Sequence, residues 1–211
     1  MAQKDKYKQI VSEKNTYFSS LISQKTYWTI EEILSISKGL LAPFKNLKED
    51  NIEPSIEVSM LYDTVYLLPY KLECYKSVVN ALYKNMGMAC EDLTINVFNA
   101  DCGIDSIAFV NALITKGYKI EDIKTVRLFS SNKEKLKRAV LLHKKLYASI
   151  PLEAYNMCIK EINDECRCNS LFTINLFAHT FHGGKNVTKF HNFYNWEFQR
   201  IFCYDDDVKI C

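Results

Sequence analysis

Residues 99–106, with the sequence NADCGIDS, place amide, carboxylate, thiol and hydroxyl side chains directly after the apolar run 93–98, LTINVF. That run is short and rich in β-branched and aromatic residues, which predicts a buried strand. In an open parallel sheet, ligands bind beyond the carboxyl ends of the strands. The segment therefore predicts a ligand-binding turn at the end of the first strand of an α/β domain.

The spacing of this segment resembles the first-strand motif of class I S-adenosylmethionine-dependent methyltransferases. In that motif, an acidic residue and three alternating glycines follow a hydrophobic run. Asn99 falls on the acidic position, and Asp101, Gly103 and Asp105 fall on the three glycine positions. The resemblance implies that Gly103 lets the backbone approach S-adenosylmethionine, and that Asn99, Asp101 and Asp105 contact its methionine or ribose part.

The resemblance extends over roughly residues 70–184. In the family, an acidic residue at the end of the second strand holds the ribose hydroxyls, and here Ser130 stands in that place. The stretch SLFTINLFAHTFHG resembles the fourth strand and its loop, where residues on the acceptor side lie. This implies that His179 and His182 border the methyl acceptor, where a histidine can act as a base. The alternative is a polar loop pair without a catalytic role.

The departures from the motif favour a weak or absent cofactor site. Glycine adopts positive φ at no steric cost, whereas aspartate does so only with strain, and Asp101 and Asp105 replace two glycines. A missing ribose carboxylate removes a charge-assisted hydrogen bond worth about 1.5–3 kcal/mol. Two hypotheses stay open: a protein that binds S-adenosylmethionine and transfers its methyl group to an unknown acceptor, and an inactive methyltransferase-fold scaffold that binds a protein partner.

The elements that would position these residues follow from periodicity and capping signals. Helices are predicted over residues 3–24, 29–41, 55–85, 106–115 and 133–147. Strands are predicted over residues 93–98, 123–129, 154–159, 171–177 and 198–203. Pro69 is expected to kink or split its helix. The order predicts a Rossmann-like α/β fold: a mostly parallel sheet flanked by helices in residues 86–211, with a helical N-terminal region, residues 1–85, packing on this core.

The predicted sheet is truncated. A methyltransferase domain of this class has seven strands and ends in an antiparallel hairpin, but only about 34 residues follow the fourth predicted strand. We therefore expect the hairpin to be missing. An unpaired sheet edge is a liability unless it is covered. We expect the N-terminal helices, the aromatic tail or a second chain to cover it, which predicts a homodimer or a complex with a protein partner.

Composition and charge bear on whether the protein is globular, binds nucleic acid or spans a membrane. The chain of 211 residues is 48% hydrophobic with a net charge of +2, which is typical of a globular protein and gives nucleic-acid binding no support. Base stacking on the aromatic tail is the weakest hypothesis. We find neither an apolar signal region at the N-terminus nor an apolar run long enough to span a membrane, so we expect a cytoplasmic protein.

The eight cysteines are expected to be reduced thiols, mostly in the core. Cys166 and Cys168, with Cys158 nearby and histidines downstream, raise the question of a metal. Zinc sites usually use paired ligands two to four residues apart on tight turns. The Cys-x-Cys and His-x-x-His spacing here does not follow that pattern, so no metal is predicted.

Overall fold

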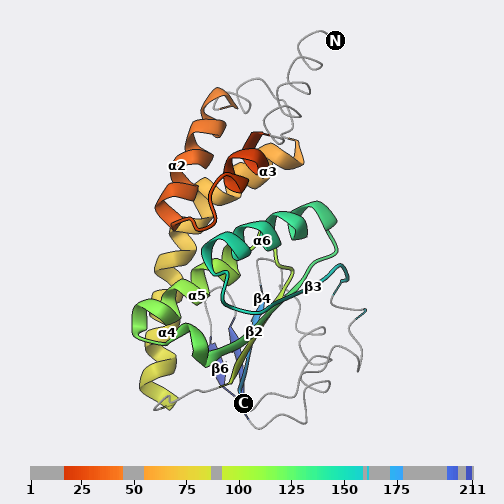
Figure 1. Ribbon diagram of the computed structural model, residues 1–211. Coiled ribbons are helices and arrows are strands. Elements are labelled where there is room, and N and C mark those ends of the chain that lie inside the picture. The colour runs from red at the N-terminus through yellow and green to blue at the C-terminus, as the bar shows by residue number, and fades with distance from the viewer. Residues whose placement is uncertain are drawn as a thin grey trace. The chain divides into compact units, whose positions relative to one another are not determined.

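The computed structural model describes residues 17–44, 55–86, 92–158, 161, 172–177, 199–203 and 208–210. The chain divides into two compact units, Met1–Pro69 and Tyr70–Cys211 (Figure 1). Our sequence-based division at residue 85 differs from this one only in where the helix over residues 70–86 belongs. In the structure, that helix is part of the second unit.

The first unit is helical in its described part. Residues 17–23 form a helix, followed by α2 (Ile30–Leu41), the short 3-10 helix η1 (Ala42–Phe44) and α3 (Ile56–Tyr62). The capping box at the start of α2 is confirmed: Thr29 Oγ1 accepts from the Glu32 N–H at 3.2 Å, and the Thr29 N–H donates to Glu32 Oε2 at 2.9 Å. These bonds satisfy two backbone N–H groups that a helix start otherwise leaves open. The first part of the predicted helix 3–24 lies outside the described residues.

Pro69 alters its helix by widening it. The π-helix η2 (Asp63–Leu67) joins α3 to α4 (Leu68–Met86), and the Leu68 N–H donates to the Asp63 carbonyl five residues earlier. A proline ring clashes with the carbonyl four residues before it and offers no N–H. A π turn just before the proline relieves that conflict while the helical path continues. The predicted disturbance is thus present, in the form of a π segment.

The second unit contains a six-stranded sheet in the order β3-β2-β1-β4-β5-β6. The strands are β1 (Leu93–Phe98), β2 (Ile123–Phe129), β3 (Leu152–Tyr155), β4 (Phe172–Phe177), β5 (Gln199–Cys203) and β6 (Val208–Ile210). The first five are mutually parallel. This confirms a Rossmann-like, mostly parallel sheet, which has fewer than seven strands in the part of the chain that the structure describes.

Two predictions about the sheet were wrong. An antiparallel final strand is present, because β6 pairs with β5 in the register Ile201↔Ile210, whereas we expected the final hairpin to be missing. The third strand starts at Leu152, directly after Pro151, and shares only Ala154 and Tyr155 with the predicted segment. A proline fits before the first ladder residue because it has no N–H to donate. A homodimer or protein partner stays a prediction.

Helices α4, α5 (Ile104–Lys116) and α6 (Lys133–Leu146) lie on one side of the sheet (Figure 1). Strand β1 is buried along its whole length, as a central strand between parallel neighbours must be. Asn132 is the N-cap of helix α6, and its side chain accepts from the Glu134 and Lys135 N–H groups. None of the helices in the described ranges combines the length and apolar character that a bilayer crossing requires.

Candidate functional site

The turn that follows β1 is built from residues with left-handed backbone conformations. Asn99, Cys102 and Gly103 have φ values of 57°, 47° and 77°. The Asp101 N–H donates to the Asn99 carbonyl at 2.6 Å, and the Ile104 N–H donates to the Asp101 carbonyl at 3.2 Å, which closes the turn onto α5. A left-handed cysteine is strained, and such strain clusters at functional sites. The predicted turn is therefore present at the carboxyl end of β1, and its binding of a ligand stays a prediction.

Gly103 is required by packing as well as by its φ. A Cβ atom at this position would lie 3.0 Å from both the Cα and the Cβ of Ala139 in α6. The glycine therefore allows the start of α5 to approach α6 closely. The Cβ position of Gly103 thus faces helix α6 and does not face a ligand-binding space.

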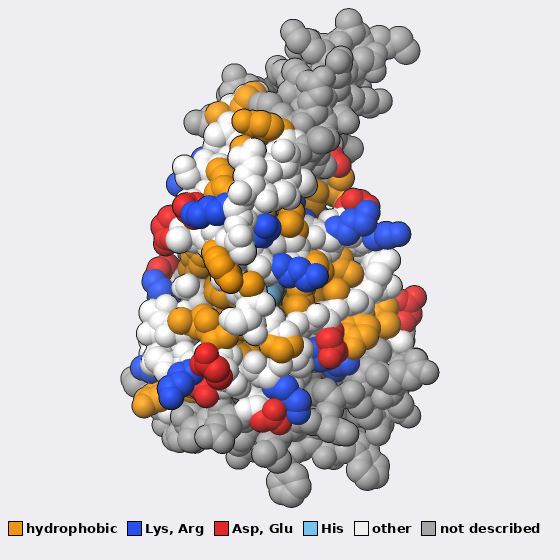
Figure 2. Space-filling view, in the orientation of Figure 1, with side chains coloured by type: hydrophobic (Ala, Val, Ile, Leu, Met, Phe, Trp, Pro, Cys, Tyr) orange, Lys and Arg blue, Asp and Glu red, His pale blue; other side chains and the backbone are white. Residues whose placement is uncertain are grey.

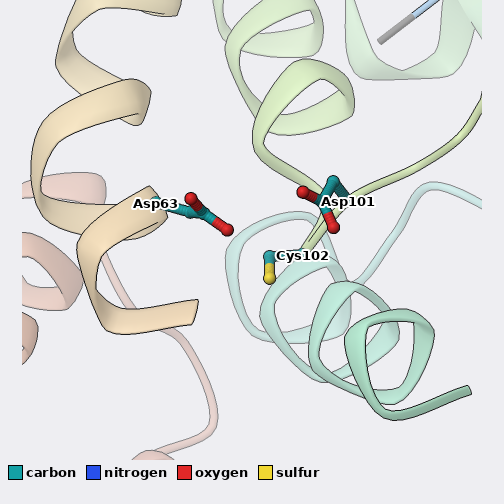
Figure 3. Close-up of side chains that lie close together, drawn as sticks. All are labelled: Asp63, Asp101 and Cys102. Atoms are coloured by element: carbon teal, nitrogen blue, oxygen red, sulfur yellow. The ribbon is translucent and has the colours of Figure 1, made fainter. Parts of the chain in front are cut away.

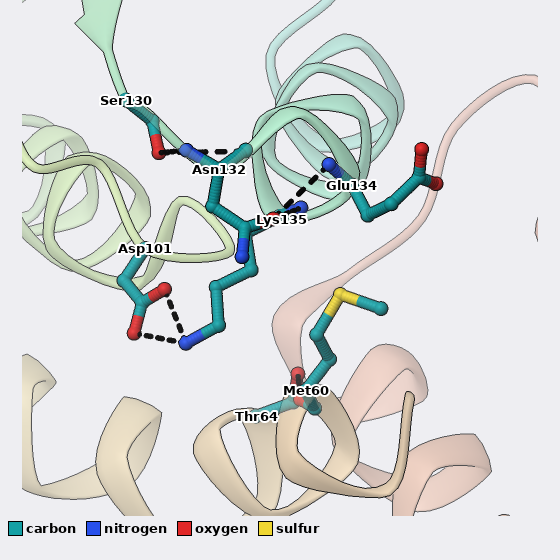
Figure 4. A network of polar contacts seen from close by, with 7 residues as sticks. All are labelled: Met60, Thr64, Asp101, Ser130, Asn132, Glu134 and Lys135. Atoms are coloured by element: carbon teal, nitrogen blue, oxygen red, sulfur yellow. Dashed lines mark hydrogen bonds and ion pairs between the residues drawn. The ribbon is translucent and has the colours of Figure 1, made fainter. Parts of the chain in front are cut away.

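Asp101 forms an ion pair with Lys135, across the turn from helix α6. Lys135 Nζ lies 2.5 Å from Asp101 Oδ1 and 2.7 Å from Oδ2, and the two side chains are 19% and 28% exposed, respectively. Figure 3 shows Asp101 beside the buried Cys102 on the turn, and Figure 4 shows Lys135 reaching back to both carboxylate oxygens. A partly exposed pair of opposite charges thus stands at the end of β1.

Asp105, in contrast, is buried in the first turn of α5. Its Oδ1 atom lies 3.2 Å from Lys71 Nζ and accepts a 2.8 Å hydrogen bond from the Tyr75 hydroxyl, both from α4. The Lys71 and Asp105 side chains are each 2% exposed. A buried carboxylate needs such partners, because an unpaired buried charge is very costly. The observed contacts of Asp105 tie α5 to α4.

Ser130 directly follows β2, where the family places its ribose-binding carboxylate. Its hydroxyl oxygen accepts from the Asn132 N–H at 3.2 Å (Figure 4). Its carbonyl accepts from Asn156 Nδ2 at 2.9 Å. The side chain is 3% exposed. Ser130 therefore shapes the turn into α6 and supplies no charge to this end of the sheet.

Aromatic rings line the carboxyl ends of the first three strands. Phe129 stacks on Phe98 with ring centroids 5.0 Å apart and on Tyr155 with centroids 4.8 Å apart. Arg127 Nε donates to Glu153 Oε2 at 2.8 Å, beside these rings. The hydrogen bond from Tyr155 holds the pKa of Glu153 below its usual value, and burial raises the pKa of the Tyr155 hydroxyl. Stacked rings and a paired arginine stabilise this edge of the sheet.

His179 and His182 fall outside the described residues, as do Cys166 and Cys168. Lys71, Tyr75 and Lys135 are contacts that sequence reasoning missed. One signal was available for the first two: a lysine and a tyrosine four residues apart share one face of an amphipathic helix.

The strand order reverses between β1 and β4, since β2 and β3 lie on one side of β1 and β4 and β5 lie on the other. The strained turn follows β1 at this switch point, a leading helix precedes the strand, and an antiparallel strand ends the sheet. The second unit therefore has a Rossmann-like α/β fold, with a ligand-binding switch point expected between β1 and β4.

No protein-family profile matches the chain, and no curated protein matches it. Among solved structures, the chain is similar to the plantazolicin methyltransferase BpumL in complex with SAH, with 12% identity, a TM-score of 0.49, and coverage of 86% of this chain and 60% of that one. It is also similar to PH1948 from Pyrococcus horikoshii, which carries the name of an RNA methyltransferase, with 14% identity, a TM-score of 0.36, and coverage of 66% of this chain and 59% of that one.

The chain spans about 60% of the length of either protein. At TM-scores below 0.5 and at these identities, the similarities are too distant to assign an activity. The fold assignment rests on the strand order and on the turn after β1.

Proposed function

We propose that this methyltransferase-like protein binds S-adenosylmethionine at the carboxyl end of β1. The switch point carries the proposal: in open α/β sheets, the ligand crevice lies where the strand order reverses, which here is between β1 and β4. The strained turn of residues 99–103 stands at that point. The proposed site comprises this turn and the Ser130–Asn132 turn at the end of β2.

The side chains at this site fit one part of the cofactor better than another. Asp101 and Lys135 offer both signs of charge near the turn, which suits the methionine end. At the end of β2, the ribose hydroxyls would meet Ser130 in place of a carboxylate, and Ser130 is buried with its hydroxyl oxygen accepting from the Asn132 N–H. The missing charge-assisted bond is worth about 1.5–3 kcal/mol, or roughly tenfold to a hundredfold in affinity. We therefore expect weak binding, with a Kd on the order of 100 μM.

When bound, S-adenosylmethionine supplies an electrophilic methyl group for transfer to a nucleophile. The contribution of the protein to such a transfer is mainly to hold donor and acceptor in line. Asn99 and Asp101 belong to the donor side of this proposal. His179 and His182 are proposed to border the acceptor.

Calorimetric titration of the full chain with S-adenosylhomocysteine, the stable product form, tests the binding proposal. We expect a one-site isotherm with a Kd of about 100 μM or tighter. Injection of the ligand into buffer is the control for the heat of dilution. No binding at millimolar ligand would contradict the proposal.

A non-catalytic scaffold is the second candidate, and one observation favours it. Asp105, a predicted cofactor contact, is instead buried against Lys71 and Tyr75, so this motif position serves the packing of α4 on α5. On the visible face of the molecule, basic, acidic and apolar side chains are interspersed, without a single basic patch (Figure 2). A scaffold would give no heat with the cofactor and would bind a protein partner instead.

A further inference from the structure

We propose that Lys71 and Tyr75 of helix α4 are positioning residues. Through Asp105, they hold the start of α5, and with it the turn of residues 99–103, in one conformation. The inference rests on the proposed function, because it concerns how that turn is kept ready for a ligand. All three side chains belong to the second unit.

The turn after β1 requires support from its surroundings. Cys102 has a left-handed φ of 47°, which is strained for a residue with a side chain. Such a conformation persists only where the surrounding structure over-determines it. The Ile104 N–H donates to the Asp101 carbonyl, and the Ser106 hydroxyl donates to the Gly103 carbonyl at 2.9 Å, so the turn is fixed to the first turn of α5. The conformation of the turn therefore depends on where α5 begins.

The start of α5 is held by directional contacts. Asp105 Oδ1 accepts from the Tyr75 hydroxyl at 2.8 Å and also lies 3.2 Å from Lys71 Nζ. The Tyr75 ring packs edge-on against Phe109, one turn further along α5, with ring centroids 5.4 Å apart. Hydrogen bonds require defined distances and angles, whereas apolar contacts have no preferred direction. The Lys71–Asp105–Tyr75 network therefore fixes the orientation of α5 on α4.

Stability alone does not account for two buried charges at this place. Desolvation of a lysine and a carboxylate offsets most of their attraction, and well-packed apolar residues of similar volume are often equally stable. A buried ion pair can instead supply conformational specificity, because a displaced arrangement leaves its charges unpaired. The network is thus suited to keeping the start of α5 in a single position.

The double variant Lys71→Met/Asp105→Leu separates positioning from stability, because it replaces the charges with apolar groups. We expect it to unfold at nearly the same urea concentration as the unsubstituted chain but to bind S-adenosylhomocysteine about tenfold more weakly, as a turn that is competent for roughly a tenth of the time implies. Without ligand, amide exchange over residues 99–104 should be faster in the double variant, with unchanged exchange over β2 as the internal control.

Tyr75→Phe tests the network by removing a single hydroxyl, and Tyr147→Phe is its matched control. The Tyr147 hydroxyl also donates to α5, at the Ile107 carbonyl at 3.1 Å, and Tyr147 is likewise buried. We expect Tyr75→Phe to weaken S-adenosylhomocysteine binding about threefold and to speed exchange over residues 99–104. Tyr147→Phe should leave the affinity within about twofold, at a similar loss of stability. Tyr75→Phe also keeps the test decisive if the double variant does not fold.

Equal effects of Tyr75→Phe and Tyr147→Phe on affinity, or unchanged exchange over residues 99–104 in a folded variant of the network, would overturn the positioning role while leaving the proposed function intact. Failure of the unsubstituted chain to bind S-adenosylhomocysteine would overturn the proposed function. The exchange measurements, which need no ligand, would then still decide whether Lys71 and Tyr75 position the turn.

Discussion

The ammonium group of Lys71 lies 3.2 Å from the carboxylate of Asp105, and both side chains are only 2% exposed. A buried pair of this kind contributes little net stability when it is intact, but removing one partner leaves an uncompensated charge. We expect Lys71→Met alone to lower the free energy of unfolding by about 3–5 kcal/mol. The double variant Lys71→Met/Asp105→Leu should recover most of that loss.

Urea denaturation of the two single variants and the double variant measures this coupling. Lys124→Met, which breaks the exposed Asp92–Lys124 pair, is the control, and it should cost less than about 1 kcal/mol. A double variant as unstable as the sum of the singles would show that Lys71 and Asp105 do not act as a pair.

Gly103 is expected to be intolerant of alanine for two separable reasons. Its φ of 77° disfavours a side chain, and the added Cβ would lie 3.0 Å from Ala139. Gly117 has a φ of 106° with nothing within 4 Å, so Gly117→Ala measures the conformational cost alone, about 1 kcal/mol. Gly103→Ala should cost clearly more than Gly117→Ala in thermal or urea unfolding. Adding Ala139→Gly should restore part of the difference, and no restoration would contradict the packing role.

His143 makes the stability of the second unit depend on pH. Burial lowers the pKa of its imidazole from 6.5 to about 4, and neither ring nitrogen has a hydrogen-bond partner among the described residues. Between these two values, the unfolded chain binds the proton and the folded chain does not, so stability rises with pH. Above pH 6.5, the buried neutral imidazole costs no stability. As the pH falls toward 4, the free energy of unfolding decreases by a total of about 3 kcal/mol.

The variant His143→Leu tests whether His143 is the source of this pH dependence of stability. The variant should flatten the decline in stability between pH 7 and 5 and should raise the stability at pH 5 most. Denaturation midpoints at the two pH values measure the effect. An equal pH dependence in the variant and the unsubstituted chain would place the titrating group elsewhere.

Asn96 and Asn175 form an amide pair in the middle of the sheet. Asn96 Nδ2 donates to Asn175 Oδ1 at 3.0 Å across the register of β1 and β4, and the other amide atom of each is buried without a partner among the described residues. We expect Asn96→Val alone to cost about 1–3 kcal/mol, since it leaves the Asn175 amide wholly unpaired. The double valine variant should be as stable as the unsubstituted chain or more so. A double variant less stable than the single one would contradict this.

Local sequence signals predicted the elements of the fold well. The β-branched runs gave β1, β2, β4 and β5, and the Thr29–Glu32 capping box marked the start of α2. The antiparallel β6 was missed because a three-residue strand leaves no periodicity to detect, and only pairing with β5 defines it. The shift of β3 to Leu152 likewise follows from its pairing with β2.

The spacing of residues along the sequence predicted where the site lies but not which side chains contact one another there. The position of the turn after β1 follows from the order of elements, so residues 99–106 could be found without a structure. The ion pairs of Asp101 and Asp105 could not be predicted, because their partners are distant in sequence. Lys135 follows Asp101 by 34 residues, and Lys71 precedes Asp105 by 34 residues. Two aspartates at equivalent motif positions thus differ in kind: one faces a partly exposed lysine, and the other is buried between two helices.

Hydrogen exchange with and without S-adenosylhomocysteine tests the central claim most directly, because it reports both binding and its place. We predict slower amide exchange in residues 99–106 and 130–132, at the ends of β1 and β2, with unchanged exchange over α2 in the first unit as the internal control. Protection confined to other segments, or no protection at millimolar ligand, would contradict a cofactor site at the carboxyl end of β1.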